Sequence, residues 1–182
     1  MSKLIDHIWA LSGLGGQDRQ DAIDLPDIQQ WMSDRDIEVQ GILWNLLGRE
    51  SFRQRIAPPL TFDEINSFFI NYYRRCLLEN PNGEWSDSRY SAGWALASWF
   101  KGLWADNKLS RQYVVDIKNA LADFYRKGDE DIRLCIINAT LEHLFENKAI
   151  ARFFKDWTAD LVLKVAYEKA ALWVKGSGSS PL

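Results

Sequence analysis

The sequence contains few of the residues that mark disulfide-stapled, secreted or membrane-spanning proteins. Among its 182 residues there are five prolines, two cysteines and two histidines. A domain held by disulfides carries more cysteines in loops, so Cys76 and Cys135, which lie within apolar helical patterns, are predicted to be reduced core residues. No run of about 18 apolar residues occurs, and the N-terminal segment lacks the apolar stretch of a signal peptide. These absences predict a cytoplasmic protein with no membrane partner.

An excess of positive charge is also absent. The 22 lysines and arginines are outnumbered by 25 aspartates and glutamates, which gives a net charge of −3. Binding to a phosphate backbone needs a basic face, so nucleic acid is excluded as the main partner. No segment repeats at a fixed period, which disfavours a solenoid of stacked helical hairpins and leaves it as the alternative architecture.

Aromatic residues are abundant: there are nine tryptophans and nine phenylalanines. Each buried aromatic side chain removes roughly 150–250 Å² from water, so a few helices can be held together strongly. Core filling is the interpretation we favour, and a ligand pocket lined by some of the rings is the alternative. A length of 182 residues fits one ordinary domain.

The segment after Pro58-Pro59 gives the clearest helix prediction. Thr61 and Glu64 have the spacing of a capping box, in which each residue satisfies a backbone N–H of the first turn. Five apolar residues then fall on one face of the helix, and Asn80 to Gly83 end it. The residues of that face are Ile65, Phe68, Phe69, Tyr72 and Cys76.

Helical spacing recurs along the rest of the chain, and no segment alternates with period two for long enough to demand a strand. Thr158 is predicted to cap the last helix, with Val162, Val165, Ala166 and Trp173 on its inward face. We therefore predict an all-α fold, a compact antiparallel bundle of about seven to nine helices. Residues 1–175 are predicted to form one domain, followed by a flexible polar tail at 176–182.

Three patterns that resemble chemical motifs fail on their context. Gly13-Leu14-Gly15-Gly16 has no following Gly-Lys-Ser/Thr and is interpreted as a hinge. His143 and Glu146 share a helix face, but a metal site needs three or four ligands, so we interpret them as a surface pair. The cysteines lie on apolar stripes without a base. The sequence thus predicts no catalytic group, no metal and no cofactor.

The densest polar-aromatic segment lies at a loop-to-helix junction, where backbone N–H groups favour anions. In one interpretation it contributes to a pocket between helices. In the other, Ser86 or Asp87 caps the helix, Arg89 pairs with a carboxylate and Trp85 folds onto the core. The residues of the alternative pocket are Glu84, Trp85, Asp87, Arg89, Tyr90, Asn138 and His143.

An acidic region is the most informative feature of the sequence. Between Gly16 and Gln40 seven acidic residues face two arginines, a local net charge of −5. Such polarisation steers a cationic partner and raises its association rate, while the alternative is a solvated face that serves solubility. We predict a partner-binding surface at Asp18, Asp21, Asp24, Asp27, Trp31, Asp34, Asp36 and Glu38.

The function expected from these patterns is that of a protein-binding module rather than an enzyme. An immunity or antitoxin role would suit an acidic helical protein that neutralises a basic protein such as a toxin domain. Trp31 or Trp85 would be exposed and would serve as anchors, as large aromatic residues do at interface hot spots. The alternative is a helical enzyme or small-ligand-binding domain with an inter-helix pocket. An exposed aromatic patch could also mediate self-association.

Overall fold

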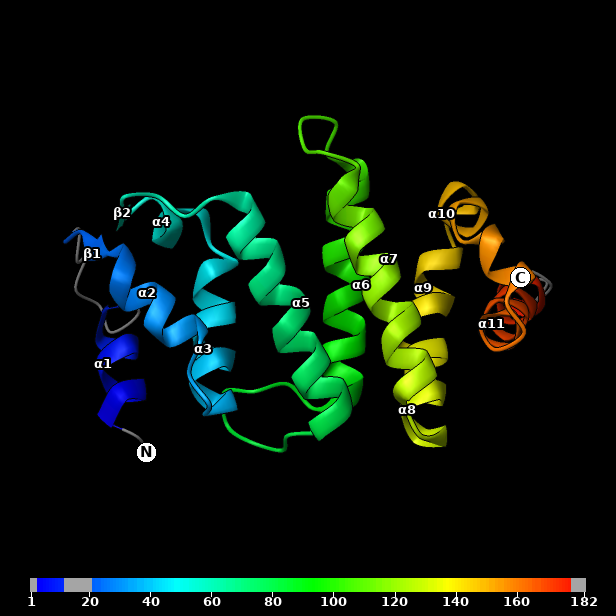
Figure 1. Ribbon diagram of the computed structural model, residues 1–182, viewed down its shortest axis with the longest axis horizontal. Helices are drawn as coiled ribbons and strands as arrows, with labels where there is room; N and C mark the ends of the chain where they lie inside the picture. Colours follow the sequence, from blue (N-terminus) through cyan, green and yellow to red (C-terminus); the bar gives the residue numbers. More distant parts are fainter. Residues whose placement is uncertain (1–2, 12–20, 178–182) are drawn as a thin grey trace. The chain divides into compact units, whose positions relative to one another are not determined.

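A computed structural model describes residues 3–11 and 21–177 of the chain. Its architecture is all-α, as the sequence predicts (Figure 1). The strands in these ranges are β1 (Ile23–Asp24) and β2 (Ile56–Ala57), which pair in parallel over two residues each. The chain forms two compact units: residues 1–76 with 81–88 make unit 1, and residues 77–80 with 89–182 make unit 2. The single domain over 1–175 stays a prediction.

Unit 1 is built around one buried helix. Its helices are α1 (Lys3–Leu11), α2 (Leu25–Met32), α3 (Ile37–Leu47), α4 (Glu50–Arg53) and α5 (Phe62–Glu79), of which the part up to Cys76 belongs to this unit. Helix α3 contacts α1, α2 and α4. Its apolar residues cover more than one face, as expected for a helix surrounded by neighbours.

Helix α5 confirms the capping-box prediction. The Thr61 hydroxyl accepts from the Glu64 N–H at 3.2 Å, and the Glu64 carboxylate accepts from the Thr61 N–H at 2.9 Å. All five residues of the predicted apolar face are buried. Trp44 of α3 packs on this helix, because its ring stacks on Tyr72 at 5.4 Å and its indole N–H donates to the Tyr73 hydroxyl at 2.9 Å.

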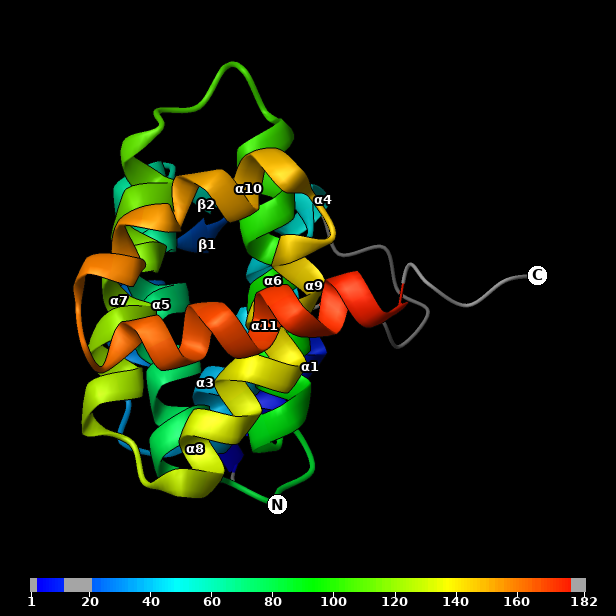
Figure 2. The same cartoon turned by 90° about the vertical axis from the view of Figure 1, so that its right-hand side faces the viewer.

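Unit 2 contains the helices from Arg89 onward. They are α6 (Arg89–Ala105), α7 (Gln112–Lys127), α8 (Glu130–Cys135), the π-helix η1 (Ile136–Leu141), α9 (Glu142–Phe145), α10 (Lys148–Phe153), the 3₁₀-helix η2 (Lys155–Ala159) and α11 (Leu163–Ser177). Segments α8, η1 and α9 follow one another without a break. Figure 2 shows α11 crossing over this continuous helix, which it contacts at η1 and α9.

Two features hold the helices of unit 2 together. The first is a close approach of α6 and η1, where the Thr140 hydroxyl donates to the Gly93 carbonyl at 3.0 Å and a Cβ on Gly93 would lie 2.7 Å from the Ala139 Cβ. The second is a cluster of aromatic rings around Phe154, which has no exposed surface. Rings that pack on Phe154 within 5.7 Å come from Phe100, Phe145, Phe153 and Trp157.

Of the predicted inward face of the last helix, Ala166 is confirmed and the other three residues are wrong. Val162, Val165 and Trp173 are exposed, and the buried residues are Leu163, Ala166 and Ala170. Small alanines let the backbone of α11 approach its neighbours closely, so the larger side chains lie on other sides. The cap differs too. The Asp160 carboxylate, rather than Thr158, accepts from the N–H groups of residues 162 and 163 at 2.9 and 3.0 Å.

Helix α11 also extends beyond its predicted end. It continues through Gly176 to Ser177, two residues into the segment predicted as a tail. The remainder of that segment, residues 178–182, lies outside the described residues.

Candidate functional sites

The predicted acidic surface divides into two groups. Asp18 lies outside the described residues. Asp21, Asp24 and Asp27 are exposed, just before and within the first turn of α2. Within the described ranges their carboxylates receive no hydrogen bond and no ion pair. The helix macrodipole favours negative charge at this end, so the fold tolerates them where they are.

The next two acidic residues shape the turn between α2 and α3. The Asp34 carboxylate accepts from the Asp36 N–H at 2.8 Å, and the Asp36 carboxylate accepts from the Glu38 N–H at 3.0 Å, which caps α3. Gln40 adds to the turn by donating its amide to the carbonyls of Met32 and Asp34. Both carboxylates therefore have local structural partners.

Glu38 fastens a distant loop to α3. Its carboxylate accepts from the N–H groups of Trp85 and Ser86 and from the Ser86 hydroxyl. On the same helix Gly41 leaves room for that loop, because a Cβ there would lie 2.1 Å from the Trp85 carbonyl oxygen. Glu38 thus has a structural role, which its pattern of charge alone did not reveal.

The prediction of an exposed Trp31 is wrong. Trp31 is only 4% exposed, and its ring lies 6.1 Å from the ring of His7. It is three residues from buried Ile28, so both occupy the inward face of α2. Trp85 is half-buried, and its ring packs on that of Trp9 at 4.7 Å.

The residues of the predicted polar-aromatic pocket are divided between the two units. Glu84, Trp85 and Asp87 belong to unit 1, whereas Arg89, Tyr90, Asn138 and His143 belong to unit 2. Glu84 is exposed.

Asp87 is held by a buried tyrosine. The Tyr72 hydroxyl accepts from the Asp87 N–H at 2.8 Å and donates to its carboxylate at 3.1 Å. Burial raises the pKa of the Asp87 carboxyl above its ordinary value. The contact holds the loop at the residue that directly follows Trp85 and Ser86, the two residues held by Glu38.

In unit 2, Arg89 has a structural role as well. Its guanidinium Nε donates to the Leu77 carbonyl at 2.9 Å, which differs from the predicted pairing with a carboxylate. Asn138 is exposed on η1. Tyr90 is exposed, and its ring lies 6.3 Å from that of Trp94.

A hollow in unit 2 contains His143. It has a volume of about 350 Å³ and is lined by Trp94, Ala97 and Ser98 of α6 and by His143 of α9. Trp94 is 52% exposed at its edge. The His143 ring also lies 6.3 Å from the ring of Trp173, so α11 contacts a residue that lines the hollow.

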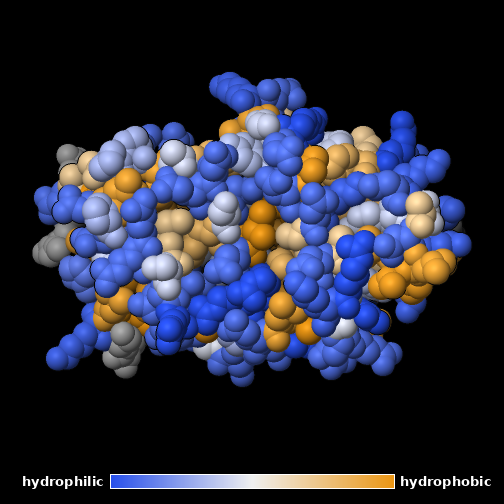
Figure 3. Space-filling view, in the orientation of Figure 1, coloured by the Kyte–Doolittle hydropathy of each residue, from blue (hydrophilic) through white to orange (hydrophobic). Residues whose placement is uncertain are grey.

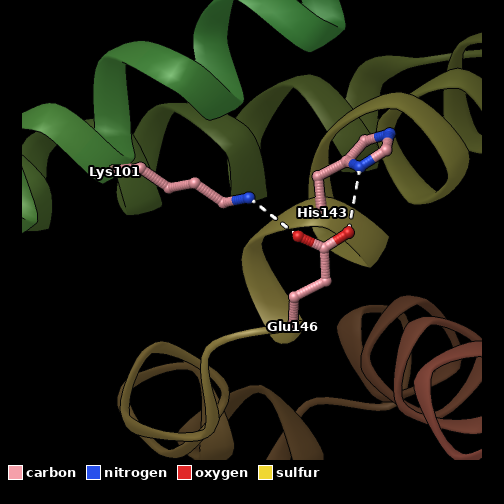
Figure 4. A network of polar contacts seen from close by, with 3 residues as sticks. All are labelled: Lys101, His143 and Glu146. Atoms are coloured by element: carbon pink, nitrogen blue, oxygen red, sulfur yellow. Dashed lines mark hydrogen bonds and ion pairs between the residues drawn. The ribbon is translucent and has the colours of Figure 1, made fainter. Parts of the chain in front are cut away.

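A small polar network stands beside the hollow (Figure 4). The Glu146 carboxylate accepts from the Lys101 ammonium at 3.0 Å and lies 3.4 Å from His143 Nδ1. The hydrogen bond from Lys101 lowers the pKa of Glu146 below its ordinary value. The predicted His143–Glu146 pair is confirmed, and Lys101 orients it from α6.

Sequence reasoning missed Trp94 and misplaced Trp173. A signal was present on α6, because Trp94, Ser98 and Lys101 are spaced by four and three residues and so share one side of a helix. Nothing in the sequence joined that side to His143, which lies more than forty residues further on.

The cysteines are placed as predicted. Cys76 and Cys135 are free and buried, and burial raises the pKa of each thiol to about 12. In residues 3–11 and 21–177, no group of three or more histidine, cysteine or acidic side chains is arranged to hold a metal ion. No helix in those ranges is long and apolar enough to cross a membrane.

Fold and sites together define the class of an all-α multi-helix bundle with an exposed acidic helix end and an aromatic-lined hollow. Comparison of the chain with protein-family models, curated proteins and solved structures finds no match.

Proposed function

We propose that the protein is a binding module for a cationic protein partner, of the immunity or antitoxin type, and that it acts in the cytoplasm. The observation that supports this proposal is the exposed group Asp21, Asp24 and Asp27, whose carboxylates have no partner among the described residues. Carboxylates that form no hydrogen bond or ion pair within the described residues are available to attract an oppositely charged partner. A basic toxin domain is a partner of that chemistry.

The distribution of charge between the units supports the same proposal. Unit 1 carries thirteen acidic and eight basic residues, a net charge of −5. Unit 2 carries twelve acidic and fourteen basic residues, a net charge of +2. The acidic excess of the chain therefore belongs entirely to unit 1, where the aspartates of α2 add to a field of the same sign.

Charge reversal at Asp24 and Asp27 is the decisive variant. The partner is first captured from native cells with the tagged chain at low and at high salt. For that purified partner, Asp24→Lys with Asp27→Lys should slow association roughly tenfold or more and flatten its salt dependence. The chain should still fold because both side chains are exposed, with a small loss of stability from positive charge at the start of α2.

Glu130→Lys with Asp131→Lys is the matched control, because these two residues are exposed in the first turn of α8. It should leave the association rate unaltered. If both pairs of reversals have the same effect, or neither has any, the acidic end of α2 is not the contact surface.

A second candidate function rests on the hollow in unit 2. Its volume of about 350 Å³ and its mixture of aromatic, hydroxyl and imidazole groups fit a small-ligand site, with or without catalysis. A ligand screen by thermal shift would look for stabilisation of the folded chain.

For a ligand found in this way, Trp94→Ala and His143→Ala should abolish the ligand-induced rise in Tm while leaving the basal Tm nearly unaltered, since both side chains are partly exposed. Arg89→Ala should instead lower the basal Tm, because its guanidinium holds the Leu77 carbonyl. A ligand shift that survives both Trp94→Ala and His143→Ala would place the ligand elsewhere.

A further inference from the structure

Helix α11 is apolar on two opposite sides. Its inner side, with Leu163, Ala166 and Ala170, is buried against the rest of unit 2. Val165 and Leu172 lie seven residues apart on the other side, and Leu172 is 66% exposed. Charged side chains flank these two residues, so the outer side of α11 presents apolar groups between charged ones to solvent.

The apolar surface extends beyond the helix itself. Leu161, just before the first turn, is 90% exposed, and Val162 and Trp173 are exposed as well. In Figure 3 hydrophobic side chains gather where Figure 1 shows α11. Contiguous exposed apolar patches of this kind mark interaction sites.

Positive charge accompanies this surface. Lys164, Lys169 and Lys175 are exposed on α11, and its acidic residue Glu168 lies 3.7 Å from the Lys164 ammonium. Asp160, at the start of the helix, is ion-paired with Arg126 at 2.8 Å. Three lysines against one glutamate give α11 a net charge of +2, which favours an anionic occupant.

We propose that the outer side of α11, from Leu161 to Lys175, binds the surface of an anionic lipid bilayer. In this arrangement the helix lies flat over about 22 Å. Leu161, Val165 and Leu172 enter the boundary between headgroups and acyl chains, and the exposed lysines meet lipid phosphates. Such binding needs no membrane-spanning helix. It departs from the expectation of no membrane partner, which rested on the absence of a spanning segment.

Vesicle flotation with the full chain tests the proposal. The protein should float with vesicles of phosphatidylcholine and phosphatidylglycerol, float far less with phosphatidylcholine alone, and lose binding as salt is raised. Equal recovery with both vesicles, or none with either, overturns the proposal.

Two variants locate the contact. Leu172→Asp and Lys169→Glu should each weaken partitioning roughly tenfold or more, because one removes an inserted side chain and the other reverses a charge at the surface. Lys108→Glu is the matched control: it makes the same charge change at an exposed position in the loop between α6 and α7 and should bind as the parent does. If all three variants lose binding alike, net charge rather than α11 is responsible and the proposal fails.

Light scattering coupled to size-exclusion chromatography tests whether a second copy of the chain, rather than a bilayer, covers the outer side of α11. A dimer that Leu172→Asp converts to a monomer would show that a second copy covers α11, and would overturn the proposal. A monomer for both forms, together with flotation on the anionic vesicles, supports it. Neither result bears on Asp24 and Asp27 of unit 1, so the binding proposal made for that unit stands or fails separately.

Discussion

Replacing Phe154 by alanine should cost about 3–5 kcal/mol in the free energy of unfolding. Its side chain is completely buried and contacts four other rings, with Trp157 nearest at a centroid distance of 5.0 Å. Truncation leaves a cavity that these flat rings, contributed by four different segments, cannot all close at once. Loss of ring-to-ring contact adds to the loss of buried area.

Urea unfolding followed by circular dichroism measures this effect. Leu172→Ala is the control, because its side chain is mostly exposed and its loss should change the unfolding free energy by no more than about 0.5 kcal/mol. A Phe154→Ala protein as stable as the Leu172→Ala protein would mean that the ring cluster is not the core of unit 2.

The same cluster explains why the aromatic excess of the sequence was interpreted correctly as a whole but not residue by residue. Composition favours core filling, and Phe100, Phe154 and Trp157 are indeed buried. Trp94 and Trp173 are equally apolar, yet both are exposed, and Trp94 lines a hollow. Which rings are covered depends on the helices that pack over them, and a single sequence does not specify that packing.

Predictions that depended only on residues close together in the sequence were confirmed. Thr61 and Glu64 lie three residues apart, so the capping box needs no tertiary contact to form. The face of α5 follows from the helical period alone. The assignments that failed, Thr158 as a cap and Trp31 as an exposed anchor, depended on where a helix starts or what covers it.

The acidic region shows the same division between local and tertiary information. Its net charge was visible in the sequence, and so was its potential to steer a partner. That Asp36 caps α3 while Glu38 holds a loop more than forty residues away required the fold. Among the described residues of the acidic region, only Asp21, Asp24 and Asp27 have carboxylates without a partner, so the proposed contact surface is reduced to one end of α2.

Gly41→Ala should destabilise the protein by about 1–3 kcal/mol, the cost of adding atoms to a filled site. The new Cβ would lie 2.1 Å from the Trp85 carbonyl oxygen, 2.5 Å from its carbon and 2.8 Å from the Ser86 Cα. All three are backbone atoms, so no side-chain rotation relieves the clash. The loop must leave α3, and the hydrogen bonds to Glu38 are lost with it.

Gly102→Ala in α6 is the matched control, since it makes the same exchange within a helix. A Cβ there meets nothing within 4 Å, so alanine should stabilise by about 0.5–1 kcal/mol through its higher helix propensity. Opposite signs for the two variants are expected, and a stabilised Gly41→Ala protein would contradict the close packing of the loop on α3.

Comparison of the Gly41→Ala and Phe154→Ala variants, each made alone, also tests the prediction of a single domain. One cooperative transition that both variants shift would support a single domain over residues 1–175. Two transitions, one shifted by Gly41→Ala and the other by Phe154→Ala, would show that the units unfold separately. In that case the acidic end of α2 and the outer side of α11 would belong to independently stable parts of the protein, and their binding activities could be measured one unit at a time.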